Sequence, residues 1–286
     1  MALFNPSDKR TVHFMGIGGA GMSALALIAC RRGVAVSGCD ADPTGAADLA
    51  ALGVRIAQGH DPGHLSGVRA VVVTAAVPPG HPELARAREL GLAIVPRKVA
   101  LAELIAGARA VGISGTHGKT TTTVMTTEAL TAAGLNPTGI AGGRVGSWGG
   151  NARVAGDDLF VVEADEFDKA FLTLYPTVAV VNNVEPDHLE CYGSMAALED
   201  AFAEFAGRAR VAIINADDAG ARRIDFEVSD GIKTYPVTYH GLVPDTFTDA
   251  SDIEVVVEGR LGGDGVIRAT DVLAKCGSRY EAAPKA

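Results

Sequence analysis

One stretch near the middle of the chain constrains the fold more than any other. An apolar run, Ala110–Ser114, is followed by the glycine turn Gly115–Gly118, then by Lys119 and the threonine run Thr120–Thr123. This order predicts a strand, a loop and the start of a helix. Backbone N–H groups of such a loop and of the helix N-terminus point inward and can bind a phosphate group. Lys119 adds a positive charge for the β- and γ-phosphates, and Thr120 offers a hydroxyl group to Mg²⁺. The alternative is a glycine turn that only opens a threonine-rich helix.

The spacing of this loop departs from the common pattern G-x-x-x-x-G-K-[ST], because Ile113 stands at the position of the first glycine. The loop instead resembles the shortened ATP loop of the Mur ligases. His117 is typical of the branch that joins L-alanine to UDP-N-acetylmuramate, and of a related branch that recycles murein tripeptide. The resemblance implies that ATP is bound by Gly115, Thr116, His117, Gly118, Lys119, Thr120 and Thr121.

A second glycine-rich loop follows the first apolar segment of the chain. The strand expected at Thr11–Met15 leads into Gly16–Gly21, a helix through Arg32 and a second strand that ends at Asp40. This is the G-x-G-x-x-G pattern of a loop that approaches a diphosphate closely, with an acid about 20 residues further on. By itself the pattern is also compatible with NAD or FAD, or with a tight turn that binds nothing.

Residues 14–26 resemble the opening of the L-alanine-adding Mur ligases, in which this loop holds UDP-N-acetylmuramate. Asp40 and Thr74 are weaker candidates, because residues at the ends of strands often have only a structural role. The resemblance implies that the UDP-sugar is contacted by Gly16, Gly18, Gly19, Ala20, Gly21, Met22, Ser23, Asp40 and Thr74.

Acidic residues follow the apolar strand expected at 158–163. Glu163, Asp165, Glu166 and Asp168 place four carboxylates within six positions, and a divalent cation would relieve their mutual repulsion. The alternative is a solvated turn. The run from Glu163 to Phe171 resembles the signature that follows the ATP loop in the Mur ligases, which implies that Glu163 binds Mg²⁺.

A further apolar strand, expected at 177–181, leads to a histidine. In the Mur ligases this segment supplies a ligand to a second Mg²⁺, which implies that role for His188, with Asp187 or Glu190 holding its other ring nitrogen. The sequence has no lysine between Lys169 and Lys233, which favours the L-alanine-adding branch over relatives that use a carbamylated lysine. The implied catalytic residues are Lys119, Glu163 and His188, and the implied metal ligands are Thr120, Glu163 and His188.

Composition excludes several other functions. The net charge of −9 argues against nucleic acid or an anionic membrane as a partner. No apolar run approaches the roughly 18 residues that a membrane span needs, and the N-terminus does not resemble a secretory signal. The four cysteines are scattered without C-x-x-C or zinc-type spacing, so we expect core thiols in a cytoplasmic protein; they are Cys30, Cys39, Cys191 and Cys276.

Together these patterns predict an α/β chain with two domains. Residues 1–108 are expected to form a Rossmann-like parallel sheet that binds the UDP-sugar, and residues 109–286 a P-loop-type, ATP-binding central domain that is incomplete. A helix over 195–208 should bury Leu198, Phe202 and Phe205 on one face. Past residue 224 the resemblance is loose, with strands expected near 253–258, 268–272 and 277–281.

The resemblance implies ATP-dependent amide formation in peptidoglycan precursor synthesis. The carboxylate of UDP-N-acetylmuramate attacks the γ-phosphate to give an acyl phosphate, and the amine of L-alanine then displaces phosphate. Full-length Mur ligases continue with a third domain, so we expect this chain to be truncated and inactive alone. The alternatives are the tripeptide-recycling ligase, a Rossmann dehydrogenase that would explain only residues 1–100, and a non-catalytic UDP-sugar-binding fragment.

Overall fold

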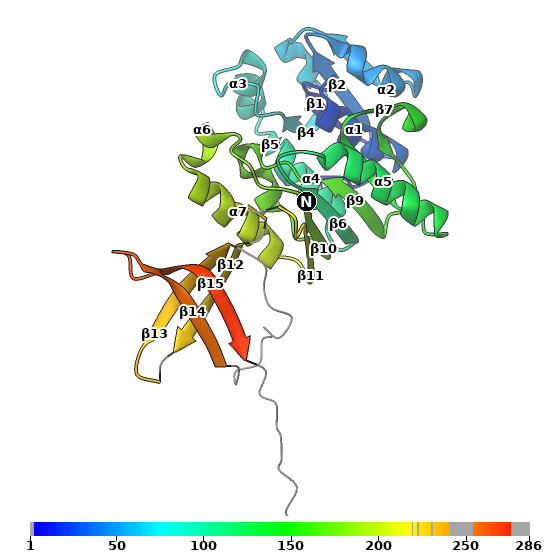
Figure 1. The fold of residues 1–286 in the computed structure, drawn as a ribbon. Coiled ribbons are helices and arrows are strands. Elements are labelled where there is room, and N and C mark those ends of the chain that lie inside the picture. Colours follow the sequence, from blue (N-terminus) through cyan, green and yellow to red (C-terminus); the bar gives the residue numbers. More distant parts are fainter. Residues whose placement is uncertain (1–2, 219, 222, 230, 241–253, 276–286) are drawn as a thin grey trace, which may run out of the picture. The chain divides into compact units, whose positions relative to one another are not determined.

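A computed structural model describes residues 3–218, 220–221, 223–229, 231–240 and 254–275 of the chain (Figure 1). They belong to two compact units. The first comprises Met1–Asn182 with Glu204–Ile213, and the second comprises Asn183–Ala203 with Ile214–Ala286. The first unit contains two β-sheets and the second contains one.

The N-terminal sheet of the first unit is fully parallel, as the Rossmann-like prediction requires. Its order is β3-β2-β1-β4-β5, with β1 in the centre. Ligands of such sheets bind beyond the carboxyl end of the strand at which the winding direction reverses, which here is β1. The strands are β1 (Thr11–Met15), β2 (Val36–Asp40), β3 (Arg55–Gln58), β4 (Val68–Val73) and β5 (Ala93–Pro96).

Four α-helices of the described chain connect these strands or follow them. The first, α1, begins directly after the glycine loop and buries every residue from Met22 to Ala29, because it is covered on both sides. It packs against α2 and α4 and also against β7 and β8 of the second sheet. The helices are α1 (Ala20–Arg31), α2 (Ala47–Ala51), α3 (Pro82–Glu89) and α4 (Arg97–Ile105).

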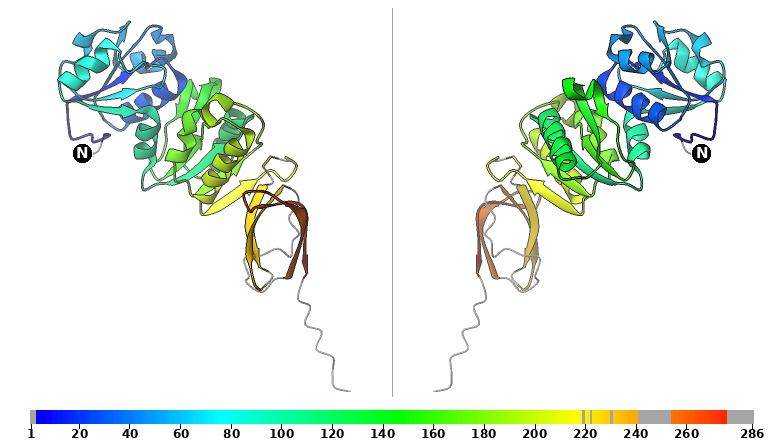
Figure 2. Two further views of the ribbon diagram at one scale, coloured as in Figure 1. Left: turned by 90° about the vertical axis from the view of Figure 1, so that its left-hand side faces the viewer. Right: turned by 90° about the vertical axis from the view of Figure 1, so that its right-hand side faces the viewer.

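The second sheet of this unit has the order β11-β10-β6-β9-β7-β8. Strands β10, β6, β9 and β7 are parallel to one another. Strand β8 pairs antiparallel with β7. The strands are β6 (Arg109–Ser114), β7 (Thr138–Val145), β8 (Gly150–Arg153), β9 (Leu159–Glu163), β10 (Val178–Val181) and β11 (Val211–Ile214). Helix α5 (Lys119–Ala132) packs against β6, β7 and β9 of this sheet, and helix α7 (Met195–Gly207) has residues in both units. Figure 2 shows the two sheets of the first unit from two further sides.

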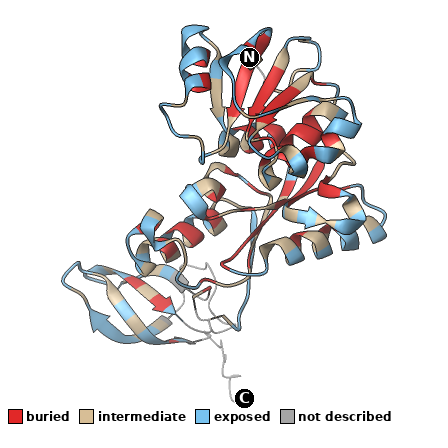
Figure 3. Ribbon diagram, turned by 90° about the horizontal axis from the view of Figure 1, so that it is seen from above, coloured by how far each residue is buried: buried red, intermediate tan, exposed pale blue. Residues whose placement is uncertain are grey.

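The core consists of the apolar strands and the faces of the helices that lie on them. Figure 3 shows the buried residues concentrated in the central strands and in the helix faces turned toward them. The predicted apolar face of α7 is confirmed, since Leu198, Phe202 and Phe205 are all buried. Phe205 stacks on Phe171 with ring centroids 5.1 Å apart.

The second unit contains a four-stranded sheet with the order β12-β13-β15-β14. The strands are β12 (Arg223–Ser229), β13 (Thr234–His240), β14 (Glu254–Leu261) and β15 (Ile267–Lys275), and the short helix α6 spans Leu189–Tyr192. The strands expected near 253–258 and 268–272 are present and pair antiparallel as β14 and β15. The strand expected at 277–281 lies outside the described residues. None of the helices in the described part of the chain has the length and apolar character that a membrane crossing requires.

Candidate functional site

The predicted phosphate loop connects β6 to α5 at the carboxyl edge of the second sheet. Strand β6 ends at Ser114 and α5 begins at Lys119. Gly118 precedes the helix with φ of 77°, a backbone conformation that favours glycine, and supplies no side-chain cap to the helix start. The amino end of a 14-residue helix therefore carries backbone donors of the kind that bind phosphate. Within this loop, Thr116 is buried, whereas His117 and Thr121 are exposed.

The side chain of Lys119 lies folded over its own loop. Its Nζ atom donates to the carbonyl oxygens of Gly115 (2.7 Å) and Thr116 (3.1 Å) and to Oε1 of Glu166 (2.8 Å). Glu166 is buried, and burial raises the pKa of its carboxyl group, although the hydrogen bond from Lys119 acts in the opposite direction. Glu166 belongs to the predicted acidic run but was not among the predicted site residues. Its partnership with Lys119 is decided by the tertiary fold.

Glu163 lies at the end of β9, beside the same loop, because β6 and β9 are parallel and pair Ile113 with Glu163. Its Oε2 atom accepts hydrogen bonds from Thr120 Oγ1 (2.9 Å) and from the backbone N–H group of Gly142 (2.6 Å). Two oxygen ligands of an octahedral Mg²⁺ lie about 2.9 Å apart, given Mg–O bonds of about 2.1 Å. The Thr120–Glu163 pair therefore fits Mg²⁺ in chemistry and spacing.

The first glycine loop and the end of β9 line one cavity of about 640 Å³ within the first unit. Ser23, which was also predicted to contact the UDP-sugar, does not line it; its Oγ atom accepts from Asn151 Nδ2 (2.8 Å) and donates to the Ala20 carbonyl (3.1 Å). The other predicted sugar-site residues all line the cavity together with Glu163: Gly16, Gly18, Gly19, Ala20, Gly21, Met22, Asp40 and Thr74.

Asp40 and Thr74 also fix the shape of the glycine loop. Oδ2 of Asp40 accepts from the backbone N–H group of Gly18 (2.8 Å), and Oδ1 accepts from that of Asp42 (3.0 Å). Gly16 has φ of 83°, and a Cβ atom there would lie 2.8 Å from Cγ2 of Thr74. Asp40 thus holds the loop through a hydrogen bond, and Thr74 leaves no space for a side chain at residue 16. Both residues also line the cavity.

Arg97 is a residue of this cavity that the sequence did not single out. It stands at the start of α4, where β5 ends, and its Nη2 atom lies 3.2 Å from Oδ2 of Asp165. A Cβ atom on Gly21 would lie 2.7 Å from Nη1 of Arg97, so the guanidinium group rests directly on the glycine loop. A guanidinium group is well suited to bind a diphosphate. The signal that could have revealed it is an arginine directly after the last strand of the sheet.

His188 belongs to the second unit, just before α6. Its Nδ1 atom lies 3.5 Å from Glu190 Oε1 and 3.8 Å from Asp187 Oδ1, so both of the predicted acidic neighbours are close to one ring nitrogen. Its backbone adopts φ of 49°, which is uncommon for a residue with a side chain. Its association with Lys119 and Glu163 stays a prediction.

Two family models match the part of the chain that builds this site. One, described as "Mur ligase family, catalytic domain", covers residues 11–109, and the other, "Mur ligase middle domain", covers residues 113–240. Residues 11–240 therefore belong to the Mur ligase family, the class of protein that the two sheets and the glycine loops at their carboxyl edges define.

Curated relatives that match the chain include proteins called UDP-N-acetylmuramate–L-alanine ligase. The protein of that name from Burkholderia cenocepacia (strain HI2424) is 45% identical over 248 residues, which is 85% of this chain and 52% of the relative. The one from Bordetella pertussis (strain Tohama I) is 43% identical over the same length. The chain thus spans about half the length of the curated relatives it matches.

Two solved structures have similar folds. UDP-N-acetylmuramate-alanine ligase MurC from Thermotoga maritima has a TM-score of 0.70 and 32% identity, and the match covers 73% of this chain and 50% of that one. The ligase for UDP-N-acetylmuramate and L-alanyl-γ-D-glutamyl-meso-diaminopimelate from Neisseria meningitides has a TM-score of 0.67 and 25% identity, with coverage of 83% and 89%.

A third family model, described as a CcmE domain, matches residues 206–283. It overlaps the Mur ligase middle domain over residues 206–240 and also covers the four-stranded sheet of the second unit. The Mur ligase middle-domain match ends at residue 240, so the loose resemblance to the Mur ligases that we expected over residues 225–286 stays a prediction past that residue.

Proposed function

We propose that this chain binds UDP-N-acetylmuramate and Mg-ATP and serves the ATP-dependent ligation of L-alanine to the sugar acid. The observation that carries the proposal is the shared cavity, in which the glycine loop after β1 faces Glu163 at the end of β9. An acceptor held by the first loop would lie beside the group that holds the nucleotide's metal ion. Positioning of this kind supplies much of the rate in phosphoryl transfer.

In this proposal the residues of the second sheet hold the triphosphate. The N–H groups at the start of α5 bind phosphate oxygens, and Lys119 releases Glu166 to contact the β- and γ-phosphates. Thr120 and Glu163 hold Mg²⁺, and His188 is the proposed ligand of a second ion. When held by these residues, Mg²⁺ would supply positive charge that offsets the negative charge of the reacting groups.

The residues of the first sheet hold the UDP-sugar. The backbone of Gly16–Gly21 and the guanidinium group of Arg97 bind the diphosphate. Asp40 stabilises the conformation of the loop by accepting the hydrogen bond from the Gly18 N–H group. The sugar carboxylate then attacks the γ-phosphate to form an acyl phosphate, with ADP as the leaving group. The amine of L-alanine attacks the acyl carbon, displaces phosphate and forms the amide. No side chain of this set needs to become a nucleophile.

The tripeptide-recycling ligase remains a second candidate, because the fold of the Neisseria meningitides enzyme covers 83% of this chain. Sequence identity favours the L-alanine branch. It is 45% to the Burkholderia cenocepacia ligase and 32% to the Thermotoga maritima enzyme, against 25% to the Neisseria meningitides enzyme. Phosphate release with L-alanine or with the tripeptide as co-substrate, measured in an active ligase that contains these residues, distinguishes the two. For these 286 residues by themselves we expect binding of the UDP-sugar to the first domain and no turnover.

Calorimetric titration of this chain with UDP-N-acetylmuramate and Mg-ATP tests the binding proposal directly. We expect each ligand to bind in the presence of the other, and NADH fluorescence to remain unchanged on addition of the protein. Enhanced NADH fluorescence together with failure to bind the UDP-sugar would instead support the dehydrogenase alternative.

Glu163→Gln is expected to weaken Mg-ATP binding by about tenfold. This factor corresponds to the free energy of about one hydrogen bond to a charged group. Glutamine can still accept hydrogen bonds from Thr120 and Gly142, so the loop should keep its shape while the negative charge is lost. The measurement is ATP affinity with and without Mg²⁺, with the exposed Glu89→Gln as the matched control. Equal Mg²⁺ dependence in wild type and variant would rule out Glu163 as a metal ligand.

A further inference from the structure

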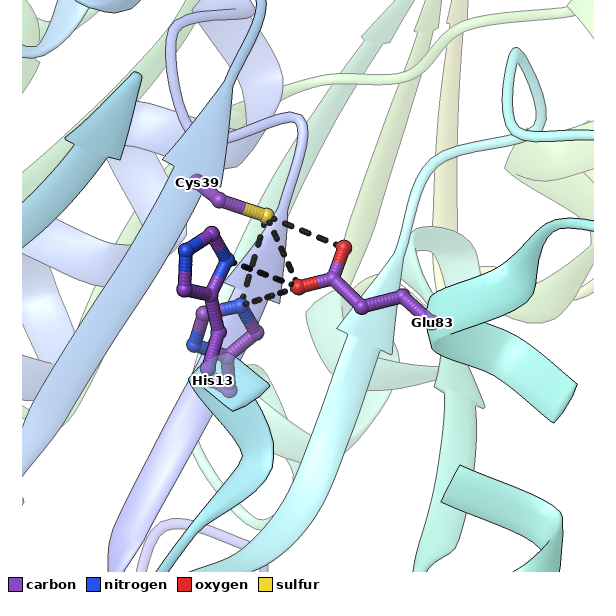
Figure 4. Close-up of side chains that lie close together, drawn as sticks. His13, Cys39 and Glu83 are labelled. Carbon is purple, nitrogen blue, oxygen red and sulfur yellow. Dashed lines mark hydrogen bonds and ion pairs between the residues drawn. The ribbon is translucent and has the colours of Figure 1, made fainter. Parts of the chain in front are cut away.

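A cluster of metal-ligand side chains lies on the N-terminal sheet, apart from the phosphate loop. His13 comes from β1, Cys39 from β2, His64 from the 3₁₀ turn Pro62–Leu65 that follows β3, and Glu83 from α3. One donor atom of each lies within 4.8 Å of those of the other three. Figure 4 shows Cys39, His13 and Glu83 pointing toward one another. His13, Cys39 and Glu83 are buried, so three polar groups meet in the interior of the domain.

We propose that His13, Cys39, His64 and Glu83 bind one divalent transition-metal ion of the zinc type. Glu83 Oε1 lies 3.0 Å from His64 Nδ1, 3.5 Å from Cys39 Sγ and 3.6 Å from His13 Nε2. Cys39 Sγ lies 3.3 Å from His13 Nε2. Tetrahedral zinc bonds of about 2.0–2.3 Å place neighbouring ligand atoms about 3.3–3.7 Å apart. These four separations are therefore close to the edges of a zinc tetrahedron, and every pair of ligand atoms lies within 4.8 Å.

The charges of these groups match a divalent ion. A cysteine thiolate and a glutamate carboxylate together carry two negative charges, which an ion of charge two offsets in a buried site. Burial, reinforced by Glu83, raises the pKa of the Cys39 thiol when no ion is bound. Burial acts to raise the pKa of Glu83 as well, but hydrogen bonds from His13 and Cys39 lower it to about 2. Metal binding requires loss of the thiol proton, because the thiolate is the form of cysteine that ligates a metal ion.

The surroundings of the cluster orient its ligands. His13 Nδ1 lies 3.0 Å from Ser37 Oγ, a contact that turns Nε2 toward the cluster, as an outer hydrogen bond does for many metal-binding histidines. His60 lies next to the cluster, with Nδ1 3.1 Å from Cys39 Sγ. A cavity of about 270 Å³ reaches His13 and His64 and provides an entry path for an ion.

His64 Nδ1 has two polar neighbours, the backbone N–H group of Asp61 at 3.3 Å and Glu83 Oε1 at 3.0 Å. A proton on this nitrogen that is donated to Glu83 and a cation bound to it both use its single in-plane position. The contact is therefore compatible with a bound ion and with a hydrogen bond. The alternative is a metal-free hydrogen-bonded network, which the experiment below distinguishes.

The donor set also selects the class of ion. Thiolate and imidazole ligands favour zinc and related transition metals, whereas Mg²⁺ and Ca²⁺ prefer oxygen ligands. This site is therefore separate from the Mg²⁺ proposed at Thr120 and Glu163, and it does not depend on the proposed ligase function.

The test is metal analysis of the untagged 286-residue chain, followed by titration of the chelator-treated protein with Co²⁺. We expect one equivalent of zinc in the purified protein, and a thiolate-to-cobalt charge-transfer band that saturates at one equivalent of Co²⁺. Cys39→Ser should lose the band, whereas the matched control Cys30→Ser should keep it. Zinc should also raise the melting temperature of the wild type and not that of Cys39→Ser.

Two further variants keep the test decisive if Cys39→Ser does not fold. His64→Ala removes a ligand whose side chain is about a quarter exposed, and it should reduce Co²⁺ affinity at least tenfold without change in the circular dichroism spectrum. Ser37→Ala removes the contact to His13 and should reduce the affinity by about 10–100-fold. A folded wild-type protein that holds no zinc and gives no charge-transfer band would overturn the proposal and favour the hydrogen-bonded network.

Discussion

Lys119→Ala is expected to weaken Mg-ATP binding by about 10–100-fold, the range for loss of a hydrogen bond to a charged group. In a ligase that contains these residues and turns over, the same change should reduce the rate by about 10²–10³-fold, because Lys119 would contact the charge that develops during phosphoryl transfer. The measurements are ATP affinity in this chain and phosphate release in the active enzyme. The exposed Lys9→Ala is the matched control.

The structure adds a complication to this experiment that the sequence does not reveal. Lys119 is the hydrogen-bond partner of the buried Glu166, so its removal also disturbs a buried carboxylate. The double variant Lys119→Ala/Glu166→Gln removes that charge and should recover any lost stability without recovering ATP binding. Recovery of ATP binding in the double variant would show that Lys119 acts by neutralising Glu166 rather than by contacting phosphate.

Gly18→Val is expected to abolish detectable binding of UDP-N-acetylmuramate while ATP binding stays within about twofold of wild type. A Cβ atom at residue 18 would collide with the backbone carbonyl of Asp42 and lie 3.0 Å from the Asp40 carboxylate. A backbone oxygen cannot rotate away, so the loop itself must move, at a cost of about 1–3 kcal/mol in stability. The N–H groups proposed to hold the diphosphate move with it.

The matched control for this variant is Gly80→Val. A Cβ atom on Gly80 would have nothing within 4 Å of it, so the same substitution meets no obstacle there. Binding of the UDP-sugar by folded Gly18→Val at wild-type affinity would remove the first glycine loop from the proposed sugar site. Calorimetry with each ligand separately, and a thermal melt of each variant, give the required measurements.

The sequence carries a strong local signal for both glycine loops. In each loop the residues of the strand, the glycine turn and the helix start are consecutive in the sequence. The loops could therefore be predicted without knowledge of the tertiary fold. The parallel sheets were predictable for the same reason, since apolar strands alternate with helices. The pairing of Thr120 with Glu163 was also within reach, because parallel strands bring their carboxyl ends to one edge of a sheet.

The sequence was less informative where partners come from distant segments. Arg97 stands 76 residues after Gly21 and carries no motif, yet its guanidinium group rests on that glycine loop. The acidic run did not indicate that Glu166, rather than Asp165 or Asp168, would bond Lys119. The strands near 253–258 and 268–272 were expected in approximately the right places, whereas the family resemblance of this segment stays a prediction.

The sequence by itself determined the two glycine loops and the α/β architecture, because both depend on residues that are neighbours in the chain or repeat at short intervals. Only the tertiary structure brought His13, Cys39, His64 and Glu83 together. Their spacing in the sequence, which does not resemble any metal motif, gives no sign of the cluster. Parallel strand pairing and the packing of α3 decide which of these side chains meet, and that information is distributed over the whole N-terminal sheet.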